Sequence, residues 1–165
     1  MSHNRKLHKI LVAIDGSIES IEAAYFAISL AARGEAELVL LYVFYSQIAY
    51  AYSSYLSKVE DSNSMNAILS SAENEAKQWF EVIKSKLSNI AESNHNIKLK
   101  TEVIITSTSV PNAIVDYAEH NMVDLIVVGA KGKSALKKIL VGSTTSELLT
   151  YSRFPILVVK KAYNK

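Results

Sequence analysis

The stretch LIVVGAKGKSALKKILVGST, residues 125–144, decides the fold. It opens with a continuous apolar run, 125–128, which is typical of a strand buried on both faces of a sheet. Three of the five glycines in the chain follow: Gly129, Gly132 and Gly142. Glycine lets backbone N–H groups approach an anion with no Cβ in the way. The stretch therefore predicts a buried strand that leads into a loop able to hold a phosphate.

Outward from this stretch, apolar runs alternate with segments of helical period. The predicted strands are residues 10–14, 38–44, 97–105, 125–128 and 155–160. Helical spacing of apolar residues predicts helices over about 18–33, 65–90 and 111–118, and a short one after Gly142. Alternation at these lengths favours a parallel sheet with right-handed crossovers and helices on both faces.

The helix ends carry local signals. Asp15 or Ser17 can cap the first helix, and Gly34 stops it. Pro111 suits the first turn of the third helix. Thr144, with a glutamate three residues later, has the spacing of a capping box and predicts the start of the last helix.

Exposure patterns place the strands in the sheet. The first, second and fourth strands are apolar throughout, whereas Ile97 to Ile105 alternates and so indicates an edge. We predict a single α/β domain over 1–165, doubly wound, with a five-stranded parallel sheet in the order 3-2-1-4-5. A segment rich in Tyr and Ser, about 46–63, has no steady period and is expected to be an irregular excursion.

The order of the strands locates a candidate site. In open α/β sheets, ligands bind beyond the carboxyl ends of the strands where the winding direction reverses, here between the first and fourth strands. Residues 15–17 (DGS) and 129–132 (GAKG) follow those two strand ends and should face each other. Gly142 leads into a helix whose N-terminus favours an anion. This pattern is what a nucleoside phosphate needs.

The Gly-Lys-Ser triplet within the loop does not form a Walker A motif. That motif requires a glycine five positions before Gly132, where this chain has Val127. The informative pattern is instead the longer spacing of Gly129, Gly132, Gly142 and Ser143.

Composition narrows the classes of function. The 165 residues are 49% hydrophobic and 21% charged, as in globular domains, and the net charge of +2 gives no broad surface for nucleic acid. The absence of cysteine excludes disulfides, thiolate metal sites and cysteine nucleophiles. The first residues do not resemble a signal peptide, and no apolar run approaches the ~20 residues of a membrane span. We expect a cytoplasmic protein that binds neither nucleic acid nor membrane.

The glycine spacing resembles the nucleotide-binding signature of the universal stress protein family, in its ATP-binding branch. Further stretches resemble family landmarks in the right order: ILVAIDGS (10–17), ELVLLYV (37–43), VDLIVVGAKGKSALKKILVGSTTSELL (123–149) and FPILVVK (154–160). The resemblance covers most of the chain and leaves only the middle, from about Ser46 to Glu102, without a landmark.

The resemblance implies a ligand and a role for particular residues. The ligand would be ATP or AMP, with Mg²⁺ as the candidate counter-ion, and the protein would be a nucleotide-dependent sensor or regulator in stress response. Asp15 would contact adenine or ribose. The remaining implied residues are Ala13, Val43 and Val128 around adenine; Gly129, Lys131, Gly132 and Lys133 at the ribose and phosphates; and Gly142, Ser143 and Thr144 at the outer phosphates. A Cβ at Gly132 is expected to stand where phosphate approaches.

The residues predict binding rather than efficient catalysis. Asp15 is the candidate metal ligand or base by position, but phosphoryl transfer also needs a positioned nucleophile and charge stabilisation. We expect slow ATP hydrolysis at most and name no catalytic residue. One alternative is a nucleotide-independent dimeric scaffold that acts through the Tyr-rich segment; another is an adenylate-forming enzyme. The intact glycine spacing disfavours the scaffold, and the lack of a paired-histidine or serine-rich phosphate motif disfavours the enzyme.

The last strand predicts a partner. Residues Ile156 to Val159 are continuously apolar, although a fifth strand should lie at an edge of the sheet. An uncovered apolar edge favours pairing with another strand. We therefore expect a two-fold homodimer through this strand.

Overall fold

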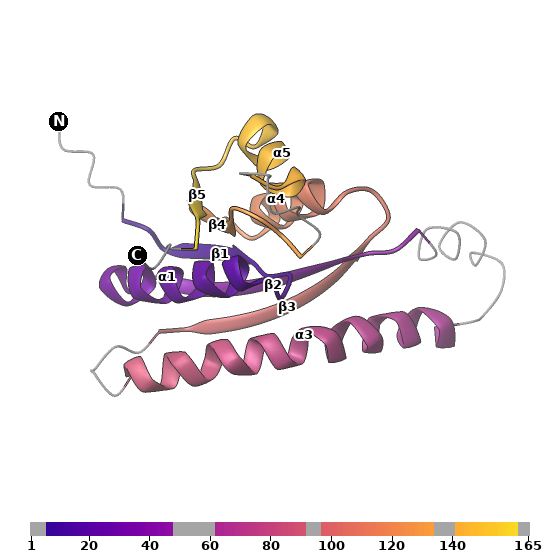
Figure 1. The fold of residues 1–165 in the computed structure, drawn as a ribbon, viewed down its shortest axis with the longest axis horizontal. Helices are drawn as coiled ribbons and strands as arrows, with labels where there is room; N and C mark the ends of the chain where they lie inside the picture. Colours follow the sequence, from indigo (N-terminus) through magenta and orange to yellow (C-terminus); the bar gives the residue numbers. More distant parts are fainter. Residues whose placement is uncertain (1–5, 48–61, 92–96, 134–140, 162–165) are drawn as a thin grey trace.

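Five parallel strands form one sheet in the computed structural model, which describes residues 6–47, 62–91, 97–133 and 141–161. The order is β3-β2-β1-β4-β5 (Figure 1). The strands are β1 (Lys9–Ala13), β2 (Glu37–Tyr45), β3 (Leu99–Thr106), β4 (Leu125–Gly129) and β5 (Ile156–Val159). The predicted fold class and strand order are confirmed, including the position of the alternating strand at an edge.

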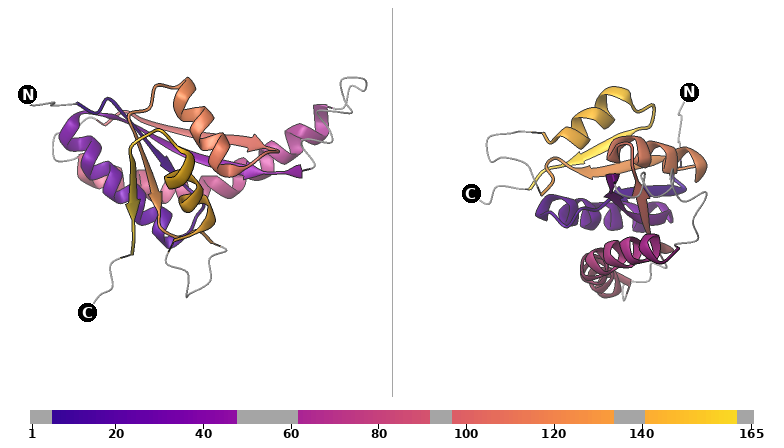
Figure 2. Two further views of the ribbon diagram at one scale, coloured as in Figure 1. Left: turned by 90° about the horizontal axis from the view of Figure 1, so that it is seen from above. Right: turned by 90° about the vertical axis from the view of Figure 1, so that its right-hand side faces the viewer.

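Helices cover both faces of the sheet, as predicted. They are α1 (Ile18–Gly34), α3 (Ser62–Ala91), α4 (Val110–His120) and α5 (Ser143–Tyr151). Helices α1 and α3 pack on one face, and α4 and α5 pack on the other (Figures 1 and 2). From β1 the chain passes through α1 to β2, toward the β3 edge of the sheet. From β4 it passes through α5 to β5, at the opposite edge. The winding direction therefore reverses between β1 and β4.

Alternate residues of the central strands supply the two cores. Ile10 and Val12 of β1 pack against α1 and α3, whereas Leu11 packs against α4 and α5, and all three are fully buried. Burial on both faces explains why β1 is apolar from Ile10 to Ala13. On α1, small side chains allow close approach to the sheet: Ala23, Ala24, Ala27 and Ala31 are all fully buried.

The ends of α1 follow the predicted signals with one refinement. Ser17 is the N-cap, and its hydroxyl oxygen accepts a hydrogen bond from the Ser20 N–H at 3.1 Å. The helix ends at Gly34, but the left-handed position after it is taken by Glu35, with φ of 54°. Glu35 also forms an exposed ion pair with Lys6 at 3.3 Å.

The predicted capping box at Thr144 is wrong. Helix α5 begins at Ser143, and its N-cap is Gly142, two residues before the predicted cap; Gly142 makes no side-chain cap hydrogen bond. Thr144 therefore lies inside the first turn, where its hydroxyl cannot act as an N-cap. The residue spacing of a capping box was present, but Gly142 had already taken the extended cap conformation.

Most of the predicted Tyr-rich excursion lies outside the described residues. Only Ser46, Gln47, Ser62 and Asn63 of that segment are described, and the last two already belong to α3. Among the helices that the structure describes, none combines the length and apolar character needed to cross a membrane.

Candidate functional site

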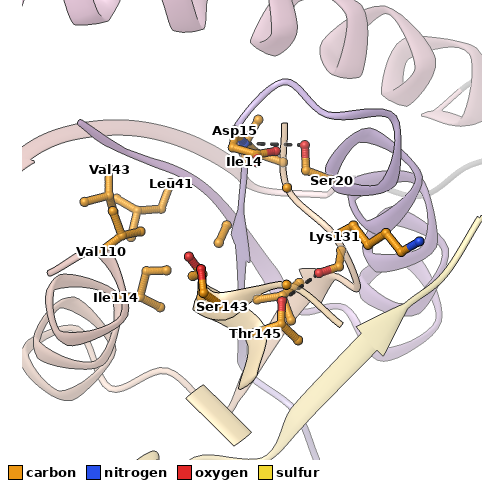
Figure 3. A pocket seen from close by; sticks show the side chains of 16 residues that line it. Ile14, Asp15, Ser20, Leu41, Val43, Val110, Ile114, Lys131, Ser143 and Thr145 are labelled. Atoms are coloured by element: carbon orange, nitrogen blue, oxygen red, sulfur yellow. Dashed lines mark hydrogen bonds between the residues drawn. The ribbon is translucent and has the colours of Figure 1, made fainter. Parts of the chain in front are cut away.

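A cavity of about 330 Å³ lies at the carboxyl ends of β1 and β4, where the winding of the sheet reverses. It is open to the surface and receives side chains from both faces of the sheet (Figure 3). Pockets that hold small ligands measure about 300–1,000 Å³, so this one has room for a single small molecule.

Ten of the eleven residues predicted for a nucleotide site line this cavity. They are Ala13, Asp15, Val43, Val128, Gly129, Lys131, Gly132, Gly142, Ser143 and Thr144. The eleventh residue, Lys133, directly follows the lining residue Gly132 in the sequence, but it does not itself line the cavity. What these residues bind stays a prediction.

Six further residues line the cavity that the sequence did not single out. They are Ile14, Ser20, Leu41, Val110, Ile114 and Thr145. Val110 and Ile114 stand four residues apart and so share one face of α4, and that apolar spacing could have indicated them. Ser20 and Thr145 gave no signal, because a lone hydroxyl in the first turn of a helix is common.

The turn after β1 is closed by its own side chains. The Asp15 Oδ1 atom accepts hydrogen bonds from the Ser17 N–H at 3.0 Å and from the Ser17 hydroxyl at 2.6 Å. The Asp15 N–H faces the Ser20 hydroxyl at 3.4 Å. Gly16, between these residues, has φ of 76°, a conformation that side chains other than glycine rarely adopt.

Asp15 also reaches across the cavity to the glycine loop, residues 129–133. Its Oδ2 atom accepts a hydrogen bond from the Lys133 N–H at 3.1 Å, and the Ser17 hydroxyl lies 3.3 Å from the Lys131 carbonyl oxygen. The two loops that face each other are thus tied through one carboxylate. A carboxylate has about four acceptor sites, so Asp15 can still accept a bond from a ligand.

A side chain on Gly129 or on Gly132 would meet a close neighbour, which is backbone for Gly129 and a carboxylate for Gly132. A Cβ on Gly129 would stand 2.7 Å from the Glu19 carbonyl carbon and 2.8 Å from the Ser20 backbone nitrogen, in the first turn of α1. A Cβ on Gly132 would stand 2.6 Å from Asp15 Oδ2. A side chain at Gly132 would therefore displace the Asp15 carboxylate that ties the two loops, in addition to the expected obstruction of a phosphate.

The N-terminus of α5 forms part of the wall of the cavity. The Gly142 N–H donates to the Ala130 carbonyl oxygen at 2.7 Å, and the buried Thr145 hydroxyl donates to the Gly129 carbonyl oxygen at 2.9 Å. These two bonds hold the first turn of α5 against the end of β4, and Figure 3 shows the one made by Thr145. Ser143 and Thr144 line the cavity from that turn.

The cavity has an apolar side and a polar side. Leu41, Val43, Val110 and Ile114 gather on one side, and Asp15, Ser20 and Lys131 lie on the other (Figure 3). An apolar wall suits the flat face of a ring, whereas backbone N–H groups and the positive end of a helix dipole suit an anion. Within the described part of the chain, no three His, Asp or Glu side chains are grouped so that they could hold a metal ion.

Fold and site together define a doubly wound α/β protein with a cavity at its topological switch point. The model of the universal stress protein family matches residues 6–160. The chain therefore belongs to the universal stress protein family, as its sequence motifs predicted.

Individual relatives agree with this assignment. Universal stress protein MJ0531 of Methanocaldococcus jannaschii is 32% identical over 93% of this chain and 82% of its own length. Universal stress protein YxiE of Bacillus subtilis is 30% identical over 93% of this chain and 99% of its own length.

Solved structures share the fold. The structure of hypothetical protein MJ0577 of M. jannaschii superposes with a TM-score of 0.74 at 27% identity, covering 97% of this chain and 100% of that one. A universal stress protein in complex with cAMP gives a TM-score of 0.64 at 20% identity, covering 96% of this chain and 100% of that one. The protein of Archaeoglobus fulgidus in complex with dAMP gives 0.60 at 16% identity, covering 94% of this chain and 100% of that one.

Proposed function

We propose that this protein binds an adenine nucleotide, ATP or AMP, in the cavity between β1 and β4 and acts as a nucleotide-dependent regulator in stress response. The observation that carries the proposal is the lining of the cavity, which combines an apolar wall with a glycine loop and a helix N-terminus. Adenine fits the wall formed by residues such as Val43 and Ile114, and phosphate fits the backbone N–H groups of the loop and of α5.

The comparisons support the class of ligand. Two solved proteins of this fold were obtained with cAMP and dAMP, which are both adenine nucleotides. At 20% and 16% identity, these proteins support the ability of the fold to hold such a ligand. Micromolar affinity, about −8 kcal/mol, is within reach of a few backbone hydrogen bonds to phosphate plus burial of one ring face.

Asp15 is the candidate residue for a metal ion that accompanies the phosphates. Mg²⁺ is usually held by one or two carboxylates together with substrate phosphates, and Asp15 lines the cavity beside the glycine loop. The proposal assigns Mg²⁺ this counter-ion role and assigns no catalytic step to Asp15.

The experiment is an analysis of the purified protein for bound nucleotide, followed by calorimetric titration with ATP and AMP, with and without Mg²⁺. We expect micromolar binding. The variant Gly132→Val should abolish it, since the new side chain would displace Asp15 from between the loops. Gly34→Val is the matched control, because a Cβ there meets only the Leu7 carbonyl oxygen, at 4.0 Å.

Two outcomes would contradict the proposal. Dissociation constants in the millimolar range or weaker for both nucleotides would favour a nucleotide-independent scaffold. Unchanged affinity in Gly132→Val, with an unchanged circular dichroism spectrum, would place the ligand elsewhere.

We also propose that two copies of the chain associate through β5. This strand is at the edge of the sheet, and its outer row of backbone N–H and C=O groups faces no other strand among the described residues. All four of its residues are only half-buried, whereas Ile126 to Gly129 of the neighbouring β4 are buried. A second copy of the same edge would cover both the backbone groups and the remaining apolar surface. Light scattering at micromolar concentration should give the mass of a dimer, and the mass of a monomer would overturn this proposal.

A further inference from the structure

The side chain of Lys133 turns away from the cavity and lies on helix α3. Its Nζ atom is 3.3 Å from Glu75 Oε1 and 3.9 Å from the centre of the Trp79 ring. The backbone of the same residue remains at the site, since its N–H donates to Asp15 and the preceding residue, Gly132, lines the cavity. Lys133 thus connects the glycine loop to α3. We call Lys133, Glu75 and Trp79 the lysine clip.

The α3 side of the lysine clip is held in place by Tyr42 of β2. The Tyr42 hydroxyl donates to Glu75 Oε2 at 3.0 Å, and its ring packs edge-on against Trp79, with 5.2 Å between ring centres. Burial raises the pKa of Tyr42 far above its usual value, and the hydrogen bond to Glu75 raises it further, so the hydroxyl stays a donor. The Trp79 ring also occupies the space where a side chain on Gly16 would be.

The lysine end of the clip is weakly held. The side chains of Lys133 and Glu75 are 49% and 44% exposed, and an ion pair at that exposure contributes little because water screens it. The cation–π contact with Trp79 is also weak at an exposed site. A lysine ammonium sits on a flexible four-carbon stem, so it can leave Glu75 while the backbone of Lys133 stays bonded to Asp15.

A phosphate in the cavity would compete with Glu75 for this ammonium. The Cα atoms of Gly132 and Lys133 are about 3.8 Å apart, as in any trans peptide, so the root of the lysine side chain adjoins the lining of the cavity. A phosphate group carries at least the charge of one carboxylate. The Lys133 ammonium therefore has two alternative partners: a phosphate in the cavity and Glu75 on α3.

We propose that Lys133 detects the phosphate of a bound nucleotide: it pairs with Glu75 and Trp79 in the empty protein and is released toward the ligand, which signals occupancy to α3. This inference rests on the proposed function, since it needs a phosphate-bearing ligand in the cavity. By linkage, a change on α3 that frees Lys133 must raise the affinity for that ligand.

The chain contains its own reporter for this change. Trp79 is the single tryptophan, and it is not among the residues that line the cavity, so its fluorescence reports the clip rather than contact with the ligand. Titration with ATP or AMP should change the emission of Trp79, because the ammonium leaves its ring. Adenosine, which lacks phosphate, should leave the emission unchanged at concentrations that saturate the site.

Two substitutions test the competition directly. Glu75→Gln removes the charge that competes for Lys133 but keeps an acceptor for Tyr42, so it should tighten ATP binding about two- to fivefold, the scale of one exposed ion pair. Lys133→Met should weaken ATP binding by a similar factor and abolish the Trp79 response. Glu81→Gln is the matched control, because Glu81 pairs with Lys84 at 3.2 Å on the same helix and should not alter binding.

The outcomes separate this inference from the function on which it rests. Opposite shifts in the two variants, with a phosphate-dependent Trp79 signal, support the inference. If calorimetry shows ATP binding but the Trp79 emission does not change, or if both variants bind ATP more weakly, the proposed function still holds. The lysine clip then only fixes the loop, and the inference is wrong. Absence of any nucleotide binding by calorimetry overturns both.

Discussion

The two loops that face each other across the cavity are stabilised in different ways. The turn after β1 is closed by neighbours in the chain: Asp15 with Ser17, and Ser17 with Ser20. The glycine loop after β4 is held from elsewhere, by Asp15, by Glu75 on α3 and by Thr145 on α5. The hydrogen bonds that close the first turn are thus mainly local, although the Trp79 ring of α3 lies against Gly16, whereas the second loop depends on distant elements. Substitutions in the second loop should therefore act through distant elements.

The largest effect is expected at Gly129, where the glycine loop leaves β4. In Gly129→Ala, the new Cβ would overlap the backbone of α1 near Glu19, which cannot move without shifting the helix. We expect a loss of about 2 to 3 kcal/mol in the free energy of unfolding. For a domain of this size, the loss corresponds to a fall in Tm of roughly 5 to 10 °C.

Thermal unfolding followed by circular dichroism measures this change. Gly34→Ala serves as the control, because the space around that residue is open. Equal melting temperatures for Gly129→Ala and the unmodified protein would show that α1 and β4 can separate at low cost.

An intermediate effect is expected at Ser17, in the self-closed turn. Ser17→Ala removes the N-cap of α1 and the hydroxyl that bonds Asp15, both of which are local contacts. The expected loss is about 1 kcal/mol in the free energy of unfolding. Urea titration of Ser17→Ala beside Ser29→Ala, an exposed serine farther along the same helix, measures the difference. If Ser17→Ala lowered the free energy of unfolding more than Gly129→Ala, the turn after β1 would be the more sensitive of the two loops, contrary to this expectation.

The smallest effect is expected at Gly142, the N-cap of α5. Its φ of −73° suits any residue, and a Cβ there would lie 3.5 Å from the nearest atom, the Gly132 backbone nitrogen. Gly142→Ala should cost about 0.5 kcal/mol, because alanine is a slightly poorer N-cap than glycine. The same urea titration tests this, and a loss near that of Gly129→Ala would mean that the two glycines are equally confined.

The same contrast explains what the sequence could predict. The cap of α1 could be narrowed to Asp15 or Ser17 because its signal lies within a few residues. The strand order followed from which apolar runs were continuous and which alternated. The position of the cavity followed from that order. Position alone indicated residues 15–17, residues 129–132 and Gly142. The full set, ten of which line the cavity, was implied by the resemblance to the universal stress protein family.

The remainder depends on contacts between distant segments. Lys133 and Glu75 are 58 residues apart, and nothing in either neighbourhood indicates that the lysine side chain will lie on α3. Thr145 bonds Gly129 from 16 residues away, so its role could not be distinguished from that of Thr144. The capping-box prediction at Thr144 is wrong because the backbone of Gly142, two residues earlier, adopts the N-cap conformation.

The short bond from the Gly142 N–H to the Ala130 carbonyl oxygen has a consequence for protein engineering. It joins Ala130, which follows β4, directly to Gly142, the N-cap of α5. We expect this bond to keep the described ends of the connection together when sequence is inserted between Lys133 and Val141. This position is a suitable point for grafting a peptide tag or a fluorescent module whose signal depends on the nearby site.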